Sequence, residues 1–243
     1  MNPCIVSFFM DNVDMKTVGL QRSVVEKFNR SHVKHYQIQT TLPHGVAIDY
    51  FMAMNGSPPE AFLDPATFKP KIEPKMDHDA VLILDIDCIP LVDRAIDTYL
   101  AYAYNGSIAG NAQRSNHIEN GQNVFAAPSA TAITKATYDK IGRPSAYPNE
   151  RSDVLEEYTF AAKEKGVRLD LAMPLRYDEP PVRYSWEKDT DPFWKLADGM
   201  PNYGIGTTYG DKISDLFYHQ FQIFVGDSQT KFWKKCESIL TGA

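Results

Sequence analysis

Apolar residues recur with two different periods in the first half of the chain. Short apolar runs at 4–10 and 36–41 have the length of strands, whereas residues 18–28 and 46–54 place apolar side chains at helical spacing. The segment 80–87 begins as another strand-like run. The pattern therefore predicts a β-α-β-α unit that leads into a further strand.

The same alternation continues, less regularly, to the end of the chain. Asp153 followed by Glu156 has the form of a capping box, and Gly166 is a typical helix stop, so this helix is predicted at 153–165. The remaining predicted elements are helices at 96–103, 135–142 and 229–240 and strands at 107–109, 124–127, 131–134 and 167–173. We expect an α/β fold in which helices cover both faces of a mainly parallel sheet.

Composition narrows the function classes. A chain of 243 residues with 43% apolar residues can bury the core of one domain, which we expect to span 1–243. The net charge of −6 makes duplex nucleic acid an unlikely partner. Cys4, Cys88 and Cys236 are scattered, which is typical of a reducing compartment. Without a signal-like start or a membrane-length apolar run, the chain is expected to be soluble and cytoplasmic.

Two segments lack a sustained period. Residues 58–74 are rich in proline, and residues 177–209 combine proline, glycine and aromatic residues. Long irregular segments in a compact domain are commonly functional.

The stretch VLILDIDCIPL places two carboxylates at the end of an apolar strand. Ligands bind beyond the carboxyl ends of parallel strands, so Asp85 and Asp87 are expected at the rim of the sheet. Alternate residues of an extended strand point the same way, so both can face one ligand. A divalent cation would relieve their repulsion. The alternative is an exposed acidic turn.

This order of features resembles the nucleotide-sugar glycosyltransferases of the GT-A fold. The resemblance implies that Asp85 and Asp87 bind Mn²⁺ (or Mg²⁺), which holds the diphosphate of a nucleotide-sugar donor, most often a UDP-sugar. In the glycogenin-like retaining branch a late histidine is the third ligand, and His219 stands in a corresponding place, although the lysine-proline-tryptophan sequence of that branch is absent. Residues 4–110 would bind the donor, and 111–243 would form the acceptor side and the C-terminal helix.

The resemblance also suggests a catalytic base. Inverting members place a carboxylate at the start of a helix in the second half, where Asp153, Glu156 and Glu157 stand. Helix capping alone would place the same acids there.

Further donor-binding residues follow from the same resemblance. Asp11 and Asn12 stand where the family grips nucleobase and ribose, and His44 could contact the phosphate or base. Gly110 and Gln113 belong to a segment that lines the sugar pocket in this fold. For each of these residues, an ordinary loop position is the alternative.

Two other functions fit parts of the sequence. LDIDCIP also resembles the nucleophile motif of haloacid-dehalogenase-like phosphatases, with Asp85 as nucleophile, and the segment 210–215 (GDKISD) resembles their magnesium motif. A non-catalytic nucleotide- or carbohydrate-binding module is the second alternative. The acceptor, which could be a glycan, protein, lipid head group or modified nucleic acid, stays open, as do stereochemistry and oligomeric state.

Overall fold

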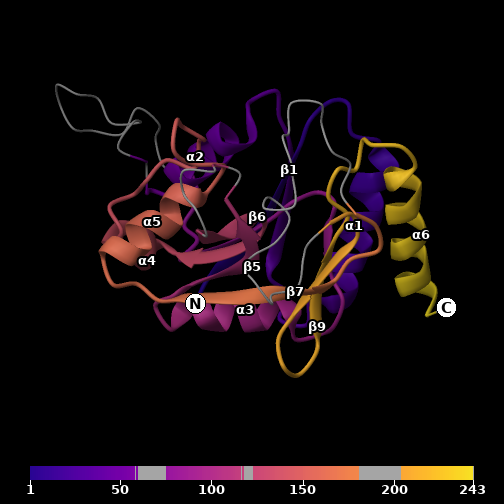
Figure 1. Cartoon of the computed structure of the whole chain (residues 1–243). Coiled ribbons are helices and arrows are strands. Elements are labelled where there is room, and N and C mark those ends of the chain that lie inside the picture. Colours follow the sequence, from indigo (N-terminus) through magenta and orange to yellow (C-terminus); the bar gives the residue numbers. More distant parts are fainter. Residues whose placement is uncertain (58, 60–74, 116, 118–122, 181–203, 243) are drawn as a thin grey trace.

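The computed structural model describes residues 1–57, 59, 75–115, 117, 123–180 and 204–242 (Figure 1). The described residues form strands β1 Pro3–Phe9, β2 Lys34–Gln39, β3 Ala80–Leu84, β4 Cys88–Pro90, β5 Ile108–Arg114, β6 Val124–Thr134, β7 Leu169–Arg176, β8 Thr207–Gly210 and β9 Asp215–His219. The described helices are α1 Met15–Phe28, α2 His44–Met54, α3 Ala95–Tyr104, α4 Lys135–Lys140, α5 Glu156–Glu164 and α6 Ser228–Thr241.

The strands join into one sheet with the order β2-β1-β3-β6-β5-β7-β8-β9-β4. The first three strands pair in parallel, as the β-α-β-α pattern predicts, and β5 pairs in parallel with β7. The other described pairs are antiparallel. The predicted α/β class is confirmed, with a parallel N-terminal part and a mixed remainder.

Helices cover both faces of the sheet. On β1 and β3, alternate residues enter different cores: Val6 and Ile83 pack in the core under α2, α4 and α5, whereas Ile5 and Leu82 pack in the core under α3. Helix α6 contacts α1 at the outside of the fold (Figure 1). Burial on both faces explains why β3 is apolar throughout.

Several boundaries differ from the sequence prediction. The two short strands expected around Pro128 are one strand, β6, because a register shift opposite Gly110 and Asn111 accommodates a proline that cannot donate a ladder hydrogen bond. The helix expected from Asp153 begins at Glu156, after Leu155 in the left-handed region. The segment 60–74 and residues 181–203 of the predicted irregular segment lie outside the described residues.

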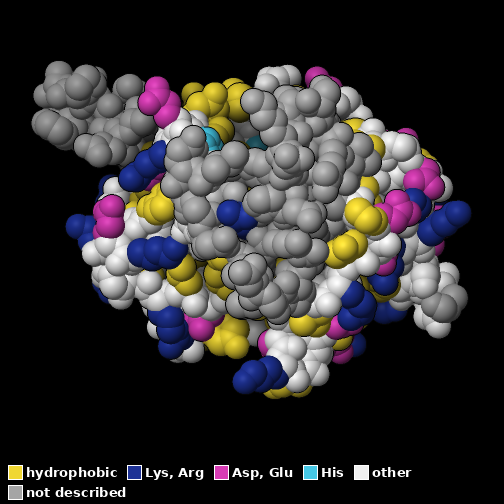
Figure 2. All heavy atoms as spheres, viewed as in Figure 1, with side chains coloured by type: hydrophobic (Ala, Val, Ile, Leu, Met, Phe, Trp, Pro, Cys, Tyr) yellow, Lys and Arg dark blue, Asp and Glu magenta, His cyan; other side chains and the backbone are white. Residues whose placement is uncertain are grey.

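The described surface carries both signs of charge. Figure 2 shows acidic and basic side chains interspersed around the outer part of the face in view. In the part of the chain that the structure describes, no helix is both long enough and apolar enough to cross a bilayer.

Candidate metal centre

The two carboxylates lie on a turn rather than on the strand itself. Strand β3 ends at Leu84, and the next four residues form a turn closed by the amide of Cys88, which donates to the carbonyl of Asp85 at 2.9 Å. The expectation that strand alternation aligns Asp85 and Asp87 is therefore wrong. The turn itself places both carboxylates at the carboxyl end of β3, while Ile86 between them packs into a small apolar cluster.

His219 joins them through strand pairing. Strands β4 and β9 are antiparallel with Cys88 opposite His219, and the amide of Gln220 donates to the carbonyl of Asp87 at 3.0 Å. The imidazole Nε2 lies 3.3 Å from Asp87 Oδ1 and 3.8 Å from Asp85 Oδ2. One ligand atom from each residue lies within 4.8 Å of the others. Oxygen and imidazole nitrogen donors in this number suit Mn²⁺ and related divalent ions.

Burial and neighbouring charges shift the pKa values of Asp85 and His219. Burial raises the pKa of Asp85, opposed by His44 and His219 and reinforced by Asp87. Burial alone would lower the pKa of His219, but the charge and hydrogen bond of Asp87 and the charge of Asp85 raise it overall. The two carboxylates and the imidazole thus interact electrostatically, and a divalent cation between them would interact favourably with all three.

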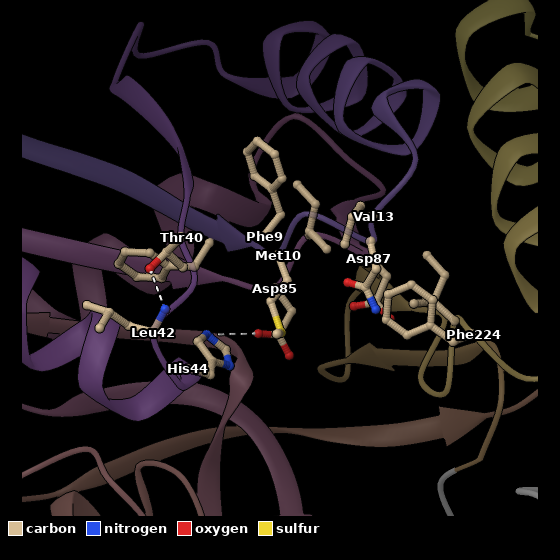
Figure 3. Close-up of a pocket in the computed structure, with 13 residues that line it drawn as sticks. Phe9, Met10, Val13, Thr40, Leu42, His44, Asp85, Asp87 and Phe224 are labelled. Atoms are coloured by element: carbon tan, nitrogen blue, oxygen red, sulfur yellow. Dashed lines mark hydrogen bonds and ion pairs between the residues drawn. The ribbon is translucent and has the colours of Figure 1, made fainter.

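A second imidazole faces the same carboxylate. His44 is the first residue of α2, and its Nε2 lies 3.5 Å from Asp85 Oδ1, as the dashed line in Figure 3 shows. This nitrogen is buried and makes no hydrogen bond with the described residues. The ring of Phe8 packs edge-on against His44 at 6.0 Å between centroids. His44 is therefore held at the site with a ring nitrogen available to a ligand.

A cavity of about 210 Å³ opens beside these residues (Figure 3). Its polar lining consists of Asn12, Thr40, His44, Asp85 and Asp87, and the rest is apolar. Among the apolar lining residues, Phe224, Met10 and Leu42 are 60%, 53% and 36% exposed. Exposed apolar side chains around a polar floor are typical of a ligand pocket.

The other predicted donor-site residues are placed differently. Asn12 lines the cavity, whereas its exposed neighbour Asp11 accepts a hydrogen bond from Gln39 at 2.8 Å. Gly110 and Gln113 lie on β5 and do not line this cavity. Gly110 has a packing reason to be glycine, because an added Cβ would lie 2.7 Å from the Cβ of Ala126.

The three predicted catalytic acids are engaged with protein groups. Fully buried Glu156 accepts from the Ser115 hydroxyl at 2.9 Å, the Asn123 amide at 2.5 Å and the backbone amide of Asp153 at 3.0 Å. The last contact is half of the predicted capping box. Asp153 Oδ1 accepts from the amide of Val154 at 2.8 Å.

Glu157 belongs to a surface ion pair instead. Arg151 donates to both of its oxygens, at 2.8 and 2.6 Å, and the hydrogen bond from Arg151 lowers the pKa of the Glu157 carboxyl. A carboxylate with a lowered pKa is a weaker proton acceptor.

The acids of the phosphatase-like motif have partners of their own. Arg94 donates to both oxygens of Asp211, at 2.8 and 2.9 Å, and Arg176 pairs with Asp215. Asp215 begins β9, the strand that ends at His219 beside the carboxylate pair. Among the described residues, Asp85 and Asp87 therefore lie together with His219 and not with these acids.

Sequence reasoning missed most of the cavity wall. Phe9 ends β1, Thr40 directly follows β2, and Phe224 lies in the loop between β9 and α6. The available signal was position, since each stands at the edge of the sheet that carries Asp85.

No family model matches the chain, and no curated protein matches it. Among solved structures, the chain is similar to the galactosyltransferase LgtC in complex with donor and acceptor sugar analogues, with 14% identity, a TM-score of 0.45 and coverage of 98% of this chain and 95% of that one. It is also similar to a mutant of a Drosophila β1,4-galactosyltransferase 7 in complex with manganese, UDP-Gal and xylobiose, with 12% identity and a TM-score of 0.41. That match covers 70% of this chain and 65% of the Drosophila chain. Both of these similar structures are galactosyltransferases, and likeness at this level assigns neither a family nor a substrate to this chain.

Proposed function

We propose that this protein is a metal-dependent glycosyltransferase that transfers a sugar from a nucleotide-sugar donor, with UDP as the nucleotide, to an acceptor. The observation that carries the proposal is the convergence of Asp85, Asp87 and His219 at the carboxyl end of β3, beside a cavity. This is the edge at which open α/β sheets bind their ligands.

The donor set fits Mn²⁺ or Mg²⁺. Two carboxylates and one imidazole would supply three ligands of the kinds that such an ion binds. A bound divalent cation supplies Lewis-acid stabilisation for the negative charge that develops on the leaving diphosphate. The carboxylates of Asp85 and Asp87 and the imidazole of His219 would hold that cation.

The remaining cavity residues would orient the donor. The apolar wall that includes Phe9 and Phe224 suits the flat faces of a base and a sugar, and Asn12 and Thr40 offer hydrogen-bonding groups. The His44 Nε2, which faces Asp85 but makes no hydrogen bond with the described residues, can donate to a phosphate oxygen when it carries a proton. For the acceptor we propose that Asp153, Glu156 or Glu157 acts on the hydroxyl, a role that must compete with the contacts these acids already make.

A thermal-shift experiment tests the proposal directly. The full chain is screened against UDP-, GDP-, ADP- and CMP-linked sugars, each with and without Mn²⁺. We expect stabilisation by a UDP-sugar that requires Mn²⁺ and disappears in Asp87→Ala, because binding to the folded state alone raises its stability.

The matched control is Asp93→Ala. Asp93 is an exposed carboxylate six residues along the chain that pairs with Arg30 at 3.0 Å, so its loss should leave the shift unchanged. Slow Mn²⁺-dependent hydrolysis of the same UDP-sugar would extend the result from binding to catalysis. Indifference to every nucleotide sugar would overturn the proposal, and release of phosphate from an aryl phosphate would favour the phosphatase instead.

A further inference from the structure

A buried glutamine touches the back of the turn that carries the two metal-binding acids. Gln21 lies on α1 with none of its surface exposed. Its amide nitrogen donates to the Ser7 hydroxyl at 2.9 Å and lies 3.3 Å from the carbonyl oxygen of Asp85 and 3.4 Å from that of Cys88. These two carbonyls are the first and last of the turn, so one side chain spans both of its ends.

The orientation of this amide is fixed by its partners. Carbonyl oxygens only accept hydrogen bonds, so the NH₂ group of Gln21 must face Asp85 and Cys88. On the other side, the Gln21 carbonyl accepts from the Gln37 amide at 2.7 Å. Gln37 is itself held, because Arg22 donates to its oxygen at 2.7 Å. A chain of hydrogen bonds therefore runs from the surface through Gln21 to the turn.

Ser7 and His35 complete the arrangement. The Ser7 hydroxyl accepts from Gln21 and lies 3.1 Å from His35 Nε2, so it can donate its own hydrogen to a neutral imidazole. Burial, followed by the charge of Arg22, lowers the pKa of His35 to about 4, which keeps the ring neutral at pH 7. The network under the turn is thus uncharged from Gln21 to His35.

We propose that Gln21 is a positioning residue for the metal centre, which holds the Asp85–Cys88 turn so that both carboxylates face His219. This inference rests on the proposed metal-dependent function. The other side of the turn is fixed by the Gln220 amide on the Asp87 carbonyl, so the turn is held from two directions. Partners that orient metal ligands from behind typically change metal affinity by about 10–100-fold when removed.

The test compares Gln21→Met, which removes the buried amide that contacts the turn, with Gln37→Met, which removes a neighbouring amide that does not contact the turn. Gln21→Met has nearly the same volume and loses the donor to the turn. Gln37→Met loses the donor to the Gln21 carbonyl, together with the Gln37 contacts to Val18 and Arg22, and leaves the turn contacts of Gln21 in place. Both leave a buried polar group unpaired, so both should lower the melting temperature. Mn²⁺ affinity, measured by electron paramagnetic resonance titration of the metal alone, separates them.

We expect Gln21→Met to weaken Mn²⁺ binding about tenfold or more and Gln37→Met to stay within about twofold of the wild type. If the two variants weaken Mn²⁺ binding equally, or Gln21→Met binds as the wild type does, the positioning role is overturned although the metal site stands. If the wild type itself binds no Mn²⁺, the proposed function fails and this inference with it. Should Gln21→Met not fold, Gln21→Asn, which keeps the amide but withdraws it by one methylene, replaces it with the same expectation.

Discussion

Two acidic segments of this chain have the same residue types and opposite surroundings. At the end of β3, the two acids of the turn lie close to two histidines, beside a cavity. At the start of α5, Glu156 is surrounded by hydrogen-bond donors and Glu157 by an arginine and an asparagine. The first group would gain stability from a cation, whereas the acids of the second already have protein partners. Partners, and not residue type, therefore determine how much each group would gain from a bound cation.

The largest expected effect is the loss of Mn²⁺ affinity when one acid of the β3 turn is replaced. Asp87→Asn removes one ligand charge while keeping the shape of the side chain, so Mn²⁺ affinity should fall by more than about 100-fold, beyond the range typical of residues that act from behind the ligands. Isothermal titration with MnCl₂ measures it. Glu157→Gln is the matched control and should bind Mn²⁺ as the wild type does. Equal losses of Mn²⁺ affinity in both variants would show that the two acidic segments do not differ in metal binding.

The second prediction concerns the α5 segment. Glu156→Ala leaves the Ser115 hydroxyl, the Asn123 amide and the Asp153 amide without their acceptor. Because at least one of these donors is buried, the free energy of unfolding should fall by about 2–4 kcal/mol. Urea denaturation measures the loss. Mn²⁺ affinity of the folded protein should not change, and a large fall in affinity would instead place Glu156 in the metal site.

The sequence predicted the elements better than the contacts between them. The apolar run before Asp85 and the helical spacing in α1 follow from local patterns, and both are confirmed. The sequence left the strand and a turn as alternatives for Asp85 and Asp87, because both can carry acids two residues apart. The position of the turn is decided by contacts with residues distant in sequence, among them Gln21 and Gln220.

One overlooked signal lay within α1. Val18, Gln21, Val25 and Phe28 follow the spacing of a helix face, so the pattern already placed Gln21 among core positions. A polar residue at such a position must find a partner, although its identity depends on tertiary structure. In contrast, His219 could be selected only by resemblance, since nothing local marks it as the residue that β9 pairs opposite Cys88.

A third buried acid, Asp49, shows what burial does to the pKa of a carboxyl group. Asp49 on α2 accepts from the Ser145 hydroxyl at 2.5 Å and the Ala146 amide at 2.8 Å, yet burial raises its pKa from 3.8 to about 6. The folded state therefore holds a proton that the unfolded state releases, and the free energy of unfolding falls as pH rises from about 4 to about 6.

Asp49→Asn should remove this dependence. Relative to the wild type, the variant should gain little at pH 4 and about 2–3 kcal/mol at pH 7, where ionised Asp49 bears the full cost of burial. Urea denaturation at several pH values measures the difference. A variant whose advantage does not grow between pH 4 and pH 6 would show that the two hydrogen bonds already stabilise the ionised form.

The smallest effect is expected at the exposed end of the α5 segment. Arg151 pairs with Glu157, but its side chain is 60% exposed, so water screens the pair and Arg151→Ala should cost less than about 1 kcal/mol in urea denaturation. Without Arg151 the pKa of Glu157 should rise, because the hydrogen bond that lowers it is gone. Carboxyl chemical shifts of Glu157 in a pH titration measure that change. If Arg151→Ala lowered the free energy of unfolding as much as Glu156→Ala does, the exposed ion pair would stabilise the helix start as strongly as the buried carboxylate. The expected difference between a buried, hydrogen-bonded acid and an exposed ion pair would then be wrong for this segment.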